Sequence, residues 1–550
     1  MEERQAASPL VGREEILERL KQRLEALKKG YRQNVSLVGP RFIGKTFLLR
    51  QFLAEVSRDP EIIPLYILFK ETDLDGFIER WLGSLLQGHL ASRGISFPED
   101  FQQLVRTSRE YIPKTLDRMR EVKKHGFQKK TALAFRELLS LTSTLREETG
   151  KKILLVLDEF QWLDSLELTD PLGLFGKEMM VQKDTFFLVT SSAPHRTKEI
   201  FSDRLSLLFG NFEVIEMGPL HLDEIKSWSQ RRFAEFRIPE ADLRLLSHLL
   251  NNHPGYFDLF FEGIERKMDR MGSGDPPGRP CNWSRELMLE ILAESLFHET
   301  GLLYIHFKLE IKELARLGKQ MRPCLKALMA VANGRAKLLQ IIAYIGRPSA
   351  ETKKILQRLV TEGVLEKKGS FFVLPDPLFR FWLRQVFYVK ERELSSDPER
   401  AFFYFKNRLQ DEMRKIEEED QKDLTSRIEA LFREFRNDVI EVSQKKIKCP
   451  AFLELASRPT NGRYFPVMGR TSNGRWFCQV FRDIVTEGDV AGFSDELKRS
   501  RKNIQRKVMV ALGGIELNAK LMAQEGKILI WDLENLNSML DLYGKLKVIQ

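Results

Sequence analysis

Residues 34–46 decide the fold that we expect, and they read Asn34-Val-Ser-Leu-Val-Gly-Pro-Arg-Phe-Ile-Gly-Lys-Thr46. The first five residues form a short apolar run that suits a buried strand. The next eight fit the pattern G-x-x-x-x-G-K-T, and the residues from Phe47 onward have helical spacing. Strand, glycine-rich loop and helix in this order are the context in which such a loop binds phosphate. The alternative is a chance match within an ordinary loop.

The chemistry of phosphate binding needs each part of this loop. Gly39 and Gly44 allow the backbone to turn its N–H groups inward, and the helix that follows adds the positive end of its dipole. Lys45 supplies a point charge for the β- and γ-phosphates, and Thr46 a hydroxyl for Mg²⁺. We therefore expect ATP and Mg²⁺ as ligands, and the nucleotide-binding residues are Gly39, Pro40, Arg41, Phe42, Ile43, Gly44, Lys45, Thr46 and Phe47.

A second motif follows the apolar run at 151–157, which suits a strand covered on both faces. It ends in Asp158-Glu159, at the carboxyl edge of the expected sheet, where the metal of a bound nucleotide would lie. Asp158 is the predicted Mg²⁺ ligand, and Glu159 the predicted catalytic group that polarises the attacking water. The alternative is a strand that ends in a solvated acidic turn.

A third strand is predicted at 185–190 and a fourth at 212–216. Ser191 and Ser192 follow the third strand directly, and a small hydroxyl there could reach the γ-phosphate or the water. We take Ser191, with Lys45 and Glu159, as a candidate catalytic residue. A simple turn at the end of the strand explains the two serines equally well.

The composition narrows the class of protein. The 550 residues carry a formal charge of +10 and predict three to five domains. No apolar run approaches the ~18 residues that span a bilayer, and the charged N-terminus does not fit a secretory signal. The four cysteines, Cys281, Cys324, Cys449 and Cys478, are widely separated, which argues against a disulfide scaffold and favours the cytoplasm.

Several motifs resemble the AAA+ and STAND-type ATPases abundant in archaea. Leu10-Val-Gly-Arg-Glu-Glu-Ile16 resembles their "VGRE-E" box, 39–46 their Walker A motif and 153–163 a Walker B motif with "DEFQ". Residues 217–225 resemble the step into the helical lid, and 376–382 the "D-P-x-x-R-F-W" segment that closes a winged helix. The resemblance covers residues 9–390. It implies that the adenine pocket is lined by Val11, Gly12 and Arg13.

The chain departs from this family in two places. The family's "L-Y-G-R" segment, whose arginine acts on a neighbouring nucleotide, corresponds here to 208–211, which ends in Asn211; Arg204 lies nearby. The lid "G-x-P" corresponds to Asn252-His253-Pro254-Gly255. Many members assemble with nucleotide between subunits, so a homo-oligomer is compatible with the resemblance, although the sequence does not fix the oligomeric state. The first departure puts fast hydrolysis triggered by a neighbouring subunit in doubt.

The middle of the chain predicts a linker at 271–280 after the lid helices, and a long helical stretch at 284–320. Helices at 323–333, 336–345 and 349–363 and a wing strand at 371–374 fit a winged helix. Lys353, Lys354 and Arg358 lie on the exposed face of its third helix and could contact DNA. Such modules also contact proteins, and three basic residues are common on any solvated face. Residues 391–447 are highly charged and predict a solvated helical connector.

The C-terminal residues alternate between strands at 476–481, 507–512 and 527–531 and helices at 494–503, 515–524 and 533–543. The order resembles restriction-endonuclease-like domains. These nucleases need an Asp and then E-x-K or Q-x-K on the next strand for metal-dependent catalysis. Here Gln479 fits the strand motif, but Phe481 stands in place of its lysine and no Asp or Glu lies between Glu454 and Asp483. We expect no nuclease activity. Phosphate contacts are predicted at the basic cluster Arg499, Arg501, Lys502, Arg506 and Lys507.

The expected fold class is therefore α/β: a P-loop NTPase parallel sheet with a helical lid, an all-α and winged-helix middle, and a small α/β restriction-endonuclease-like domain. The predicted boundaries are 1–218 for the ATPase core, 219–320 for lid and linker, 321–390 for the winged helix, 391–449 for the connector and 450–550 for the last domain. The expected function is an ATPase switch that couples nucleotide state to DNA or a partner. An ATP-dependent defence nuclease and a regulatory DNA-binding protein with negligible hydrolysis remain alternatives.

Overall fold

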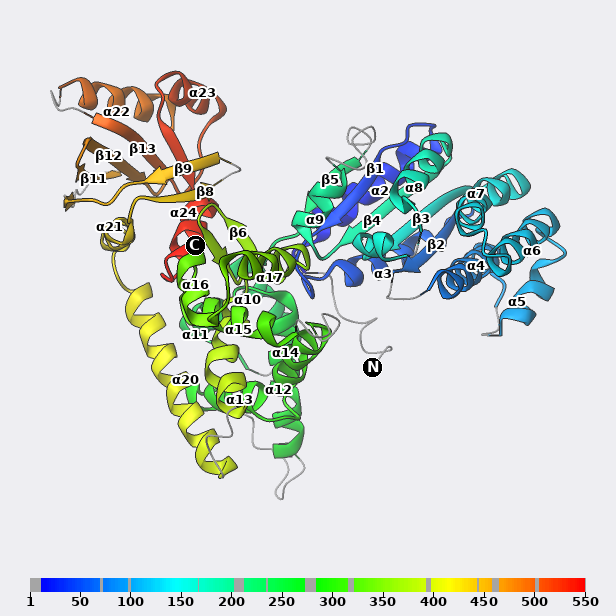
Figure 1. Ribbon diagram of the computed structural model, residues 1–550, viewed down its shortest axis with the longest axis horizontal. Helices are drawn as coiled ribbons and strands as arrows, with labels where there is room; N and C mark the ends of the chain where they lie inside the picture. Colours follow the sequence, from blue (N-terminus) through cyan, green and yellow to red (C-terminus); the bar gives the residue numbers. More distant parts are fainter. Residues whose placement is uncertain are drawn as a thin grey trace. The chain divides into compact units, whose positions relative to one another are not determined.

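The computed structural model divides the chain into two compact units (Figure 1). The first unit comprises the described residues up to Trp228, together with His253–Gly255 and Thr361–Gly363, and the second comprises the rest. The described residues are 11–69, 73–96, 100–166, 168–201, 212–233, 236–272, 283–314, 321–391, 397–442, 445–457, 464–499 and 504–549. The expected linker at 271–280 lies largely outside these ranges. Arg204 and Asn211 lie wholly outside them.

The first unit is built on a five-stranded parallel sheet with the strand order β2-β3-β4-β1-β5. The strands are β1 (Asn34–Val38), β2 (Ile62–Leu68), β3 (Lys152–Asp158), β4 (Thr185–Ser191) and β5 (Phe212–Glu216). The four strands predicted from the sequence are confirmed, and β2 joins them. A five-stranded parallel sheet surrounded by helices fits a P-loop NTPase fold.

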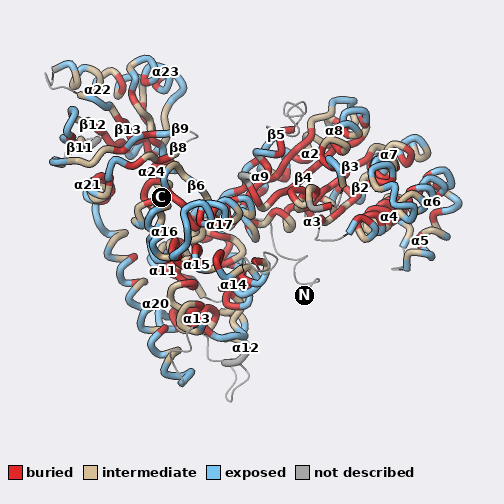
Figure 2. The backbone as a smooth tube through the Cα atoms, in the orientation of Figure 1, coloured by how far each residue is buried: buried red, intermediate tan, exposed pale blue. Residues whose placement is uncertain are grey.

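Both faces of this sheet are buried because the side chains of each strand alternate between two cores. On β3, Leu154 and Val156 join the core formed with α2 (Glu14–Lys28) and α3 (Lys45–Val56). Leu155 and Leu157 join the larger core on the opposite face. Figure 2 shows the strands as a nearly continuous buried layer. The near-continuous apolar run in the sequence is thus explained by helices on both faces.

The larger core is covered by helices inserted between β2 and β3. These are α4 (Leu74–Ala91), α5 (Phe101–Ser108), α6 (Pro113–Phe127) and α7 (Thr131–Thr149). The 3-10 helix η1 (Phe160–Ser165) and the helices α8 (Pro171–Val181) and α9 (Pro194–Glu199) follow the next two strands, and α10 (Leu222–Arg232) follows β5. Asp73 and Asp100 cap α4 and α5 by accepting hydrogen bonds from Gly76 N and Gln103 N.

The second unit begins with helices. They are α11 (Glu240–Leu249), α12 (Pro254–Gly272, whose first two residues belong to the first unit), α13 (Arg285–Phe297) and α14 (Leu302–Glu313). The expected single helical stretch at 284–320 is therefore divided in two, at Gly301. A Cβ at Gly301 would lie 2.4 Å from the carbonyl oxygen of Ser295, so the chain folds back there more closely than a larger residue allows.

The elements expected over 323–374 are present. The helices α15 (Met321–Ala332), α16 (Leu338–Ile345) and α17 (Ser349–Thr361) precede an antiparallel hairpin of β6 (Glu366–Lys368) and β7 (Phe371–Val373). Then α18 (Pro377–Trp382) continues into the π-helix η5 (Leu383–Phe387) and α19 (Tyr388–Glu391). Asp376 caps α18 by accepting hydrogen bonds from Leu378 N and Phe379 N. Burial raises the pKa of Asp376, and the buried hydroxyl of Tyr256 donates to the same carboxyl group.

The prediction of a helical connector over 391–447 is wrong for its last part. The helices α20 (Pro398–Asp420) and α21 (Leu424–Glu434) are followed by the antiparallel strands β8 (Asp438–Val442) and β9 (Lys445–Cys449). Ile440, Val442, Ile447 and Cys449 are buried in the C-terminal core at every second position. The exposed lysines between them make the segment look like a charged helix, while its apolar residues have the period of a strand.

The C-terminal sheet is mixed, with the order β10-β11-β12-β13-β14. Here β10 (Glu454–Ser457), β11 (Tyr464–Thr471) and β12 (Gly474–Phe481) are antiparallel, whereas β12, β13 (Ile504–Ala511) and β14 (Leu529–Asp532) are parallel. The helices are α22 (Glu487–Arg499), α23 (Leu517–Glu525) and α24 (Leu533–Leu542). The predicted alternation of strand and helix after residue 474 is confirmed.

The first of these helices begins seven residues before its predicted start at 494, because its N-terminus has a cap that the sequence prediction overlooked. The amide and the hydroxyl of Thr486 each donate to Asp489 Oδ2 at 2.8 Å. Thr486-x-x-Asp489 is thus a capping motif that starts α22 at Glu487. Within the described residues, no helix has the length and apolar character needed to cross a membrane.

His89 on α4 is a buried base in the first unit, and it makes the stability of this unit dependent on pH. Only 1% of the residue is exposed, and neither ring nitrogen has a hydrogen-bond partner among the described residues. Burial, with Arg93 and Lys151 nearby, lowers the pKa of His89 to about 4. Since the unfolded chain binds this proton with a pKa near 6.5, stability falls as the pH drops from about 6.5 toward 4.

We therefore predict that His89→Leu makes the protein less sensitive to acid. Between pH 7 and pH 5, the free energy of unfolding should fall by about 2 kcal/mol less in the variant than in the parent protein. Urea unfolding at both pH values measures this difference. The exposed His221→Gln is the control and should behave like the parent. Equal losses in the His89 variant and the parent would contradict the prediction.

Candidate functional site

The loop between β1 and α3 places its backbone close to its neighbours. A Cβ at Gly39 would lie 2.4 Å from the carbonyl oxygen of Met217, and the Gly39 amide donates to Ser191 O at 3.1 Å. Gly44 has φ +98°, a conformation that residues with a Cβ rarely adopt. It precedes the first turn of α3, whose N–H groups have no partner within the helix. The loop therefore ends at a helix N-terminus suited to an anion.

Lys45 lies inside this loop, and the residue is only 4% exposed. Its ammonium group donates to the carbonyl oxygens of Gly39 and Pro40, at 2.8 Å each. Burial lowers the pKa of Lys45 to about 8, although the nearby carboxylates of Glu159 and Asp158 act in the opposite direction. A phosphate group at the loop would favour the charged form of this amine.

Asp158, the last residue of β3, is 1% exposed and accepts hydrogen bonds from three neighbouring elements. The Tyr66 hydroxyl on β2 donates to Oδ2 at 2.6 Å, and the Thr46 hydroxyl on α3 donates to the same oxygen at 3.2 Å. The Thr190 hydroxyl on β4 donates to Oδ1. The structure therefore brings Thr46 and Asp158, the two predicted metal ligands, to hydrogen-bond distance of each other.

Glu159 follows in a left-handed conformation with φ +58°, which costs about 1–2 kcal/mol in a residue with a Cβ. Its amide donates to the Thr190 hydroxyl at 3.1 Å. The Glu159 carboxylate accepts hydrogen bonds from the Gln161 side-chain amide and from the Ser192 hydroxyl. It is therefore held in one orientation by two neutral donors, at the same edge of the sheet as Asp158.

Ser191 and Ser192 differ in what they contact. The Ser191 oxygen accepts a hydrogen bond from the Ala193 amide at 3.1 Å, so this hydroxyl belongs to a local turn. Ser192 is the serine that reaches Glu159. The geometry thus favours the turn interpretation for Ser191, and it makes Ser192 the better candidate for a contact with the predicted water site.

The segment with Val11, Gly12 and Arg13 lies against the residues that follow β5. Arg13 is largely buried and donates to the carbonyl oxygens of Gly218 and, at 3.2 Å, Gly12. A Cβ at Gly12 would lie 2.4 Å from Glu224 Oε1, and the φ of +63° there also favours glycine. Residues 11–13 and the start of α10 are therefore held together.

His253 also reaches the glycine-rich loop, a contact that sequence reasoning missed. Its Nε2 donates to the carbonyl oxygen of Arg41 at 2.8 Å, and burial lowers the pKa of His253 to about 4. The neutral imidazole thus fixes the outer part of the loop. A Cβ at Gly255 would lie 2.8 Å from the Cβ of Phe42, which explains a glycine after Pro254.

Tyr66, Thr190 and Gln161 were also missed. For Tyr66 and Thr190 the signal was position, near the ends of β2 and β4. Gln161 is the last residue of the "DEFQ" motif, two residues after Glu159. In a parallel sheet such positions meet at the carboxyl edge. Identifying Tyr66 needs the further knowledge that β2 pairs with β3, where it lies opposite Val156.

The basic residues predicted to contact DNA are less completely described. Lys353 and Lys354 are exposed on α17, and Arg358 is half-buried on the same helix. Of the C-terminal cluster, Arg501 and Lys502 lie outside the described residues, as does the side chain of Arg499. Arg506 is exposed on β13, whereas Lys507 is half-buried and donates to Gly526 O at 3.2 Å.

Comparisons with known proteins agree with the description of the first unit. Residues 9–177 match the family described as AAA ATPase domain. No curated protein sequence matches the chain. Among solved structures, the chain is similar to a Walker-type ATPase of Pyrococcus abyssi, with 19% identity, a TM-score of 0.49, and coverage of 68% of this chain and 96% of that one.

Two further structures are similar over comparable lengths. The ORC1 protein of Aeropyrum pernix, solved in complex with DNA, has 14% identity and a TM-score of 0.40, covering 70% of this chain and 95% of that one. A RuvB variant of Thermotoga maritima has 13% identity and a TM-score of 0.32, covering 68% and 94%. The family match identifies an AAA ATPase domain in residues 9–177, which contain Lys45, Asp158 and Glu159.

The contacts of Asp158 lead to a prediction about Tyr66. Tyr66→Phe removes a charge-assisted hydrogen bond from a buried carboxylate while keeping the ring, so it should destabilise the first unit by about 1–3 kcal/mol. Urea unfolding at pH 7 measures this loss. Tyr31→Phe, at an exposed tyrosine of the same unit, is the matched control and should change stability by less than about 0.5 kcal/mol. Equal stability of the Tyr66 variant and the parent would refute the role of this hydroxyl.

Proposed function

We propose that this protein binds ATP with Mg²⁺ and hydrolyses it, and that the nucleotide state controls the binding of DNA or a protein partner. One observation carries the proposal: Lys45, Thr46, Asp158 and Glu159 come from separate segments and meet at the carboxyl edge of one parallel sheet. Phosphate binding, metal binding and water activation each need one of these groups.

The glycine-rich loop would hold the phosphates. The backbone N–H groups at the start of α3 and the Lys45 ammonium supply donors and positive charge there. Residues 39–47 surround this position, and Val11, Gly12 and Arg13 would lie against the adenine. The carbonyl oxygens of Gly39 and Pro40, which Lys45 contacts in this structure, would give way to phosphate oxygens.

The donor set fits Mg²⁺, because a threonine hydroxyl and a carboxylate lie side by side next to the loop. Thr46 and Asp158 would hold the ion, directly or through water. When bound, Mg²⁺ neutralises charge on the phosphates. Tyr66 and Thr190 keep Asp158 oriented, so the carboxylate has little freedom to lose on binding.

Glu159 would accept the proton of the attacking water. In this structure its carboxylate accepts hydrogen bonds from Gln161 and Ser192, two neutral donors that keep it oriented. Ser192 rather than Ser191 would then share the water site with Glu159. A carboxylate held in place by two donors is an effective general base only where one of them can yield to water.

Two substitutions separate binding from turnover. Lys45→Ala should weaken binding of a fluorescent ATP analogue by about 100-fold or more, because a buried charged donor is lost. Glu159→Gln should leave the dissociation constant within about threefold and lower kcat by about 10²–10⁴-fold. Equilibrium binding and steady-state phosphate release measure the two effects.

The exposed Lys29→Ala and Glu147→Gln are matched controls in the same unit and should behave like the parent. Unchanged nucleotide affinity in the Lys45 variant would overturn the proposed site. Undetectable hydrolysis by the parent, with ATP still bound, would favour a regulatory protein for which the nucleotide is mainly structural. That alternative is motivated by Asn211, which stands where the family has an arginine.

The proposed DNA-binding element is the winged helix formed by α15, α16, α17 and the β6–β7 hairpin. Three helices followed by a two-stranded hairpin have the order of such a module. Lys353, Lys354 and Arg358 on α17 would contact phosphates, with Arg506 and the rest of the C-terminal cluster as a second basic surface. A protein partner is the alternative ligand for this helix face.

The C-terminal sheet is proposed to be restriction-endonuclease-like without nuclease activity. Phe481 on β12 stands where a lysine would be needed, and no upstream carboxylate lies between Glu454 and Asp483. Gln479, which fits the motif, donates to Glu496. Among the described residues, no three His, Cys, Asp or Glu side chains are grouped closely enough to hold a metal ion. An ATP-dependent nuclease is therefore the less favoured alternative, and plasmid cleavage in the presence of Mn²⁺ would restore it.

Salt dependence tests the DNA-binding proposal. Replacing Lys353, Lys354 and Arg358 together with Gln should weaken duplex binding and reduce the slope of log K against log[salt] by up to about 3, or about 0.9 for each lost phosphate contact. Fluorescence anisotropy between 50 and 200 mM salt, about the range in which such slopes are read, measures both. A triple Gln variant of the exposed Arg408, Arg414 and Lys415 on α20 controls for net charge. Equal slopes for the two triple variants would exclude α17 as the contact.

A further inference from the structure

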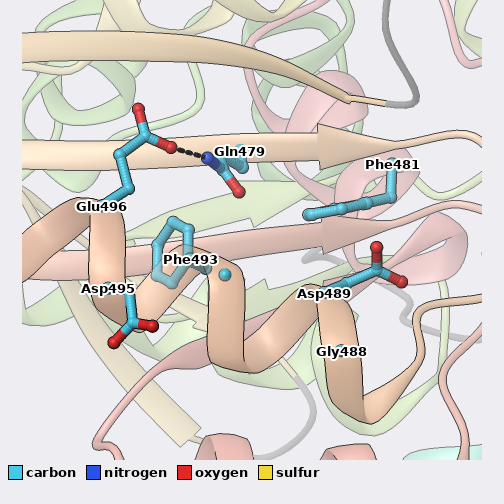
Figure 3. Close-up of a pocket in the computed structure, with 8 residues that line it drawn as sticks. Gln479, Phe481, Gly488, Asp489, Phe493, Asp495 and Glu496 are labelled. Atoms are coloured by element: carbon cyan, nitrogen blue, oxygen red, sulfur yellow. Dashed lines mark hydrogen bonds between the residues drawn. The ribbon is translucent and has the colours of Figure 1, made fainter.

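A pocket of about 450 Å³ lies in the C-terminal part of the chain, between β12 and α22. Its lining includes Gln479 and Phe481 from the strand and Asp489, Phe493, Asp495 and Glu496 from the helix (Figure 3). The volume lies within the range of pockets that bind small molecules, about 300–1,000 Å³. Among the described residues, no basic side chain lines it. Its polar lining therefore consists of three carboxylates and one amide.

Gln479 gives the pocket a hydrogen-bond acceptor, its amide oxygen. The residue is 1% exposed, and its Nε2 donates to Glu496 Oε2 at 2.6 Å. No group of the described residues donates to the amide oxygen, Oε1. In Figure 3 this oxygen points away from Glu496, into the space between strand and helix. An amide oxygen that faces a pocket without a donor can accept a hydrogen bond, so it favours a ligand that carries N–H or O–H groups.

Glu496 adds a negative charge that no described basic side chain neutralises. Within the described part of the chain, its carboxylate contacts only the neutral amide of Gln479. Asp495, by contrast, lies in an exposed position and pairs with Lys498 at 3.3 Å. Asp489 accepts two hydrogen bonds from Thr486 as the cap of α22. The three carboxylates together make the pocket negative, with Glu496 the least compensated.

Aromatic rings form the remaining large lining groups. Phe481 and Phe493 are both buried, and each contributes its side chain to the pocket. The face of an aromatic ring attracts organic cations as well as apolar groups. A bare metal ion is a poorer match, because no three carboxylates of the described residues are grouped closely enough to hold one. The chemistry of the lining thus selects an organic cation with N–H donors.

We propose that this pocket binds a protonated amine or guanidinium group. The cation would pair with Glu496, donate to the amide oxygen of Gln479 and lie against Phe481 and Phe493. It could belong to a free polyamine or to a lysine or arginine side chain of a peptide, since both present the same chemistry. The pocket is built entirely from the second unit, so the inference does not depend on the ATP site.

Calorimetric titration of the full-length, nucleotide-free protein tests this proposal with two probes. Spermidine represents a free polyamine, and a capped Gly-Arg-Gly peptide represents a side chain. Glu496→Gln keeps the size of the residue and an acceptor for Gln479 but removes the charge, so it should weaken binding about tenfold or more. Gln479→Met removes the free acceptor at similar volume and should also weaken binding.

Glu487→Gln is the matched control, because Glu487 is exposed on the same helix and does not line the pocket. Binding of either probe that is weakened by Glu496→Gln but not by Glu487→Gln supports the proposal, and the probe that binds identifies the source of the cation. Thermal unfolding of each variant shows whether the fold is kept. Binding of neither probe, or equal binding by the Glu496 variant and the parent, would overturn the proposal.

Discussion

The first unit depends on the way one buried carboxylate is satisfied. Asp158 ends β3 inside the protein, where an ionised group without hydrogen bonds would cost several kcal/mol. Tyr66, Thr46 and Thr190 supply the donors, and they come from β2, α3 and β4. The carboxylate can be stable only if both neighbouring strands and the helix after the loop are in register. The same contacts bring the glycine-rich loop to the edge of the sheet where Asp158 and Glu159 lie.

The other charged groups of the site follow the same constraint. Burial lowers the pKa of Lys45. Its ammonium group donates hydrogen bonds to the carbonyl oxygens of Gly39 and Pro40 in its own loop. Glu159 is held by Gln161 and Ser192. Each charge thus has neutral partners that a ligand can replace. This arrangement suits a site that exchanges internal hydrogen bonds for contacts with phosphate, metal and water.

In the second unit, the buried polar groups near Asp376 and those near Gln479 differ in how they are hydrogen-bonded. Asp376 caps α18 and accepts from Tyr256, and Trp382 donates to Leu296 O at 2.9 Å within an aromatic core. These contacts give the Asp376 carboxyl group and the Trp382 indole nitrogen partners inside the protein, and they explain the "D-P-x-x-R-F-W" segment as a structural element. Gln479 and Glu496 differ, because one acceptor and one charge face a pocket. That contrast is the reason to look for a ligand in the C-terminal sheet.

The sequence by itself determined the features that depend on near neighbours. The apolar run at 153–157, the glycine at position 44 with its positive φ and the Lys45-Thr46 pair could be predicted because strand, loop and helix preferences act over a few residues. The hairpin at 438–449 was not predicted, because its many charged residues resemble those of a solvated helix and obscure the alternation of apolar and polar residues. Only the tertiary structure decided that Tyr66, 92 residues away, meets Asp158, and that Glu496 meets Gln479. Those contacts depend on strand order and register, which arise when distant segments are buried against each other. Such contacts produce no recognisable pattern of residue spacing in the sequence.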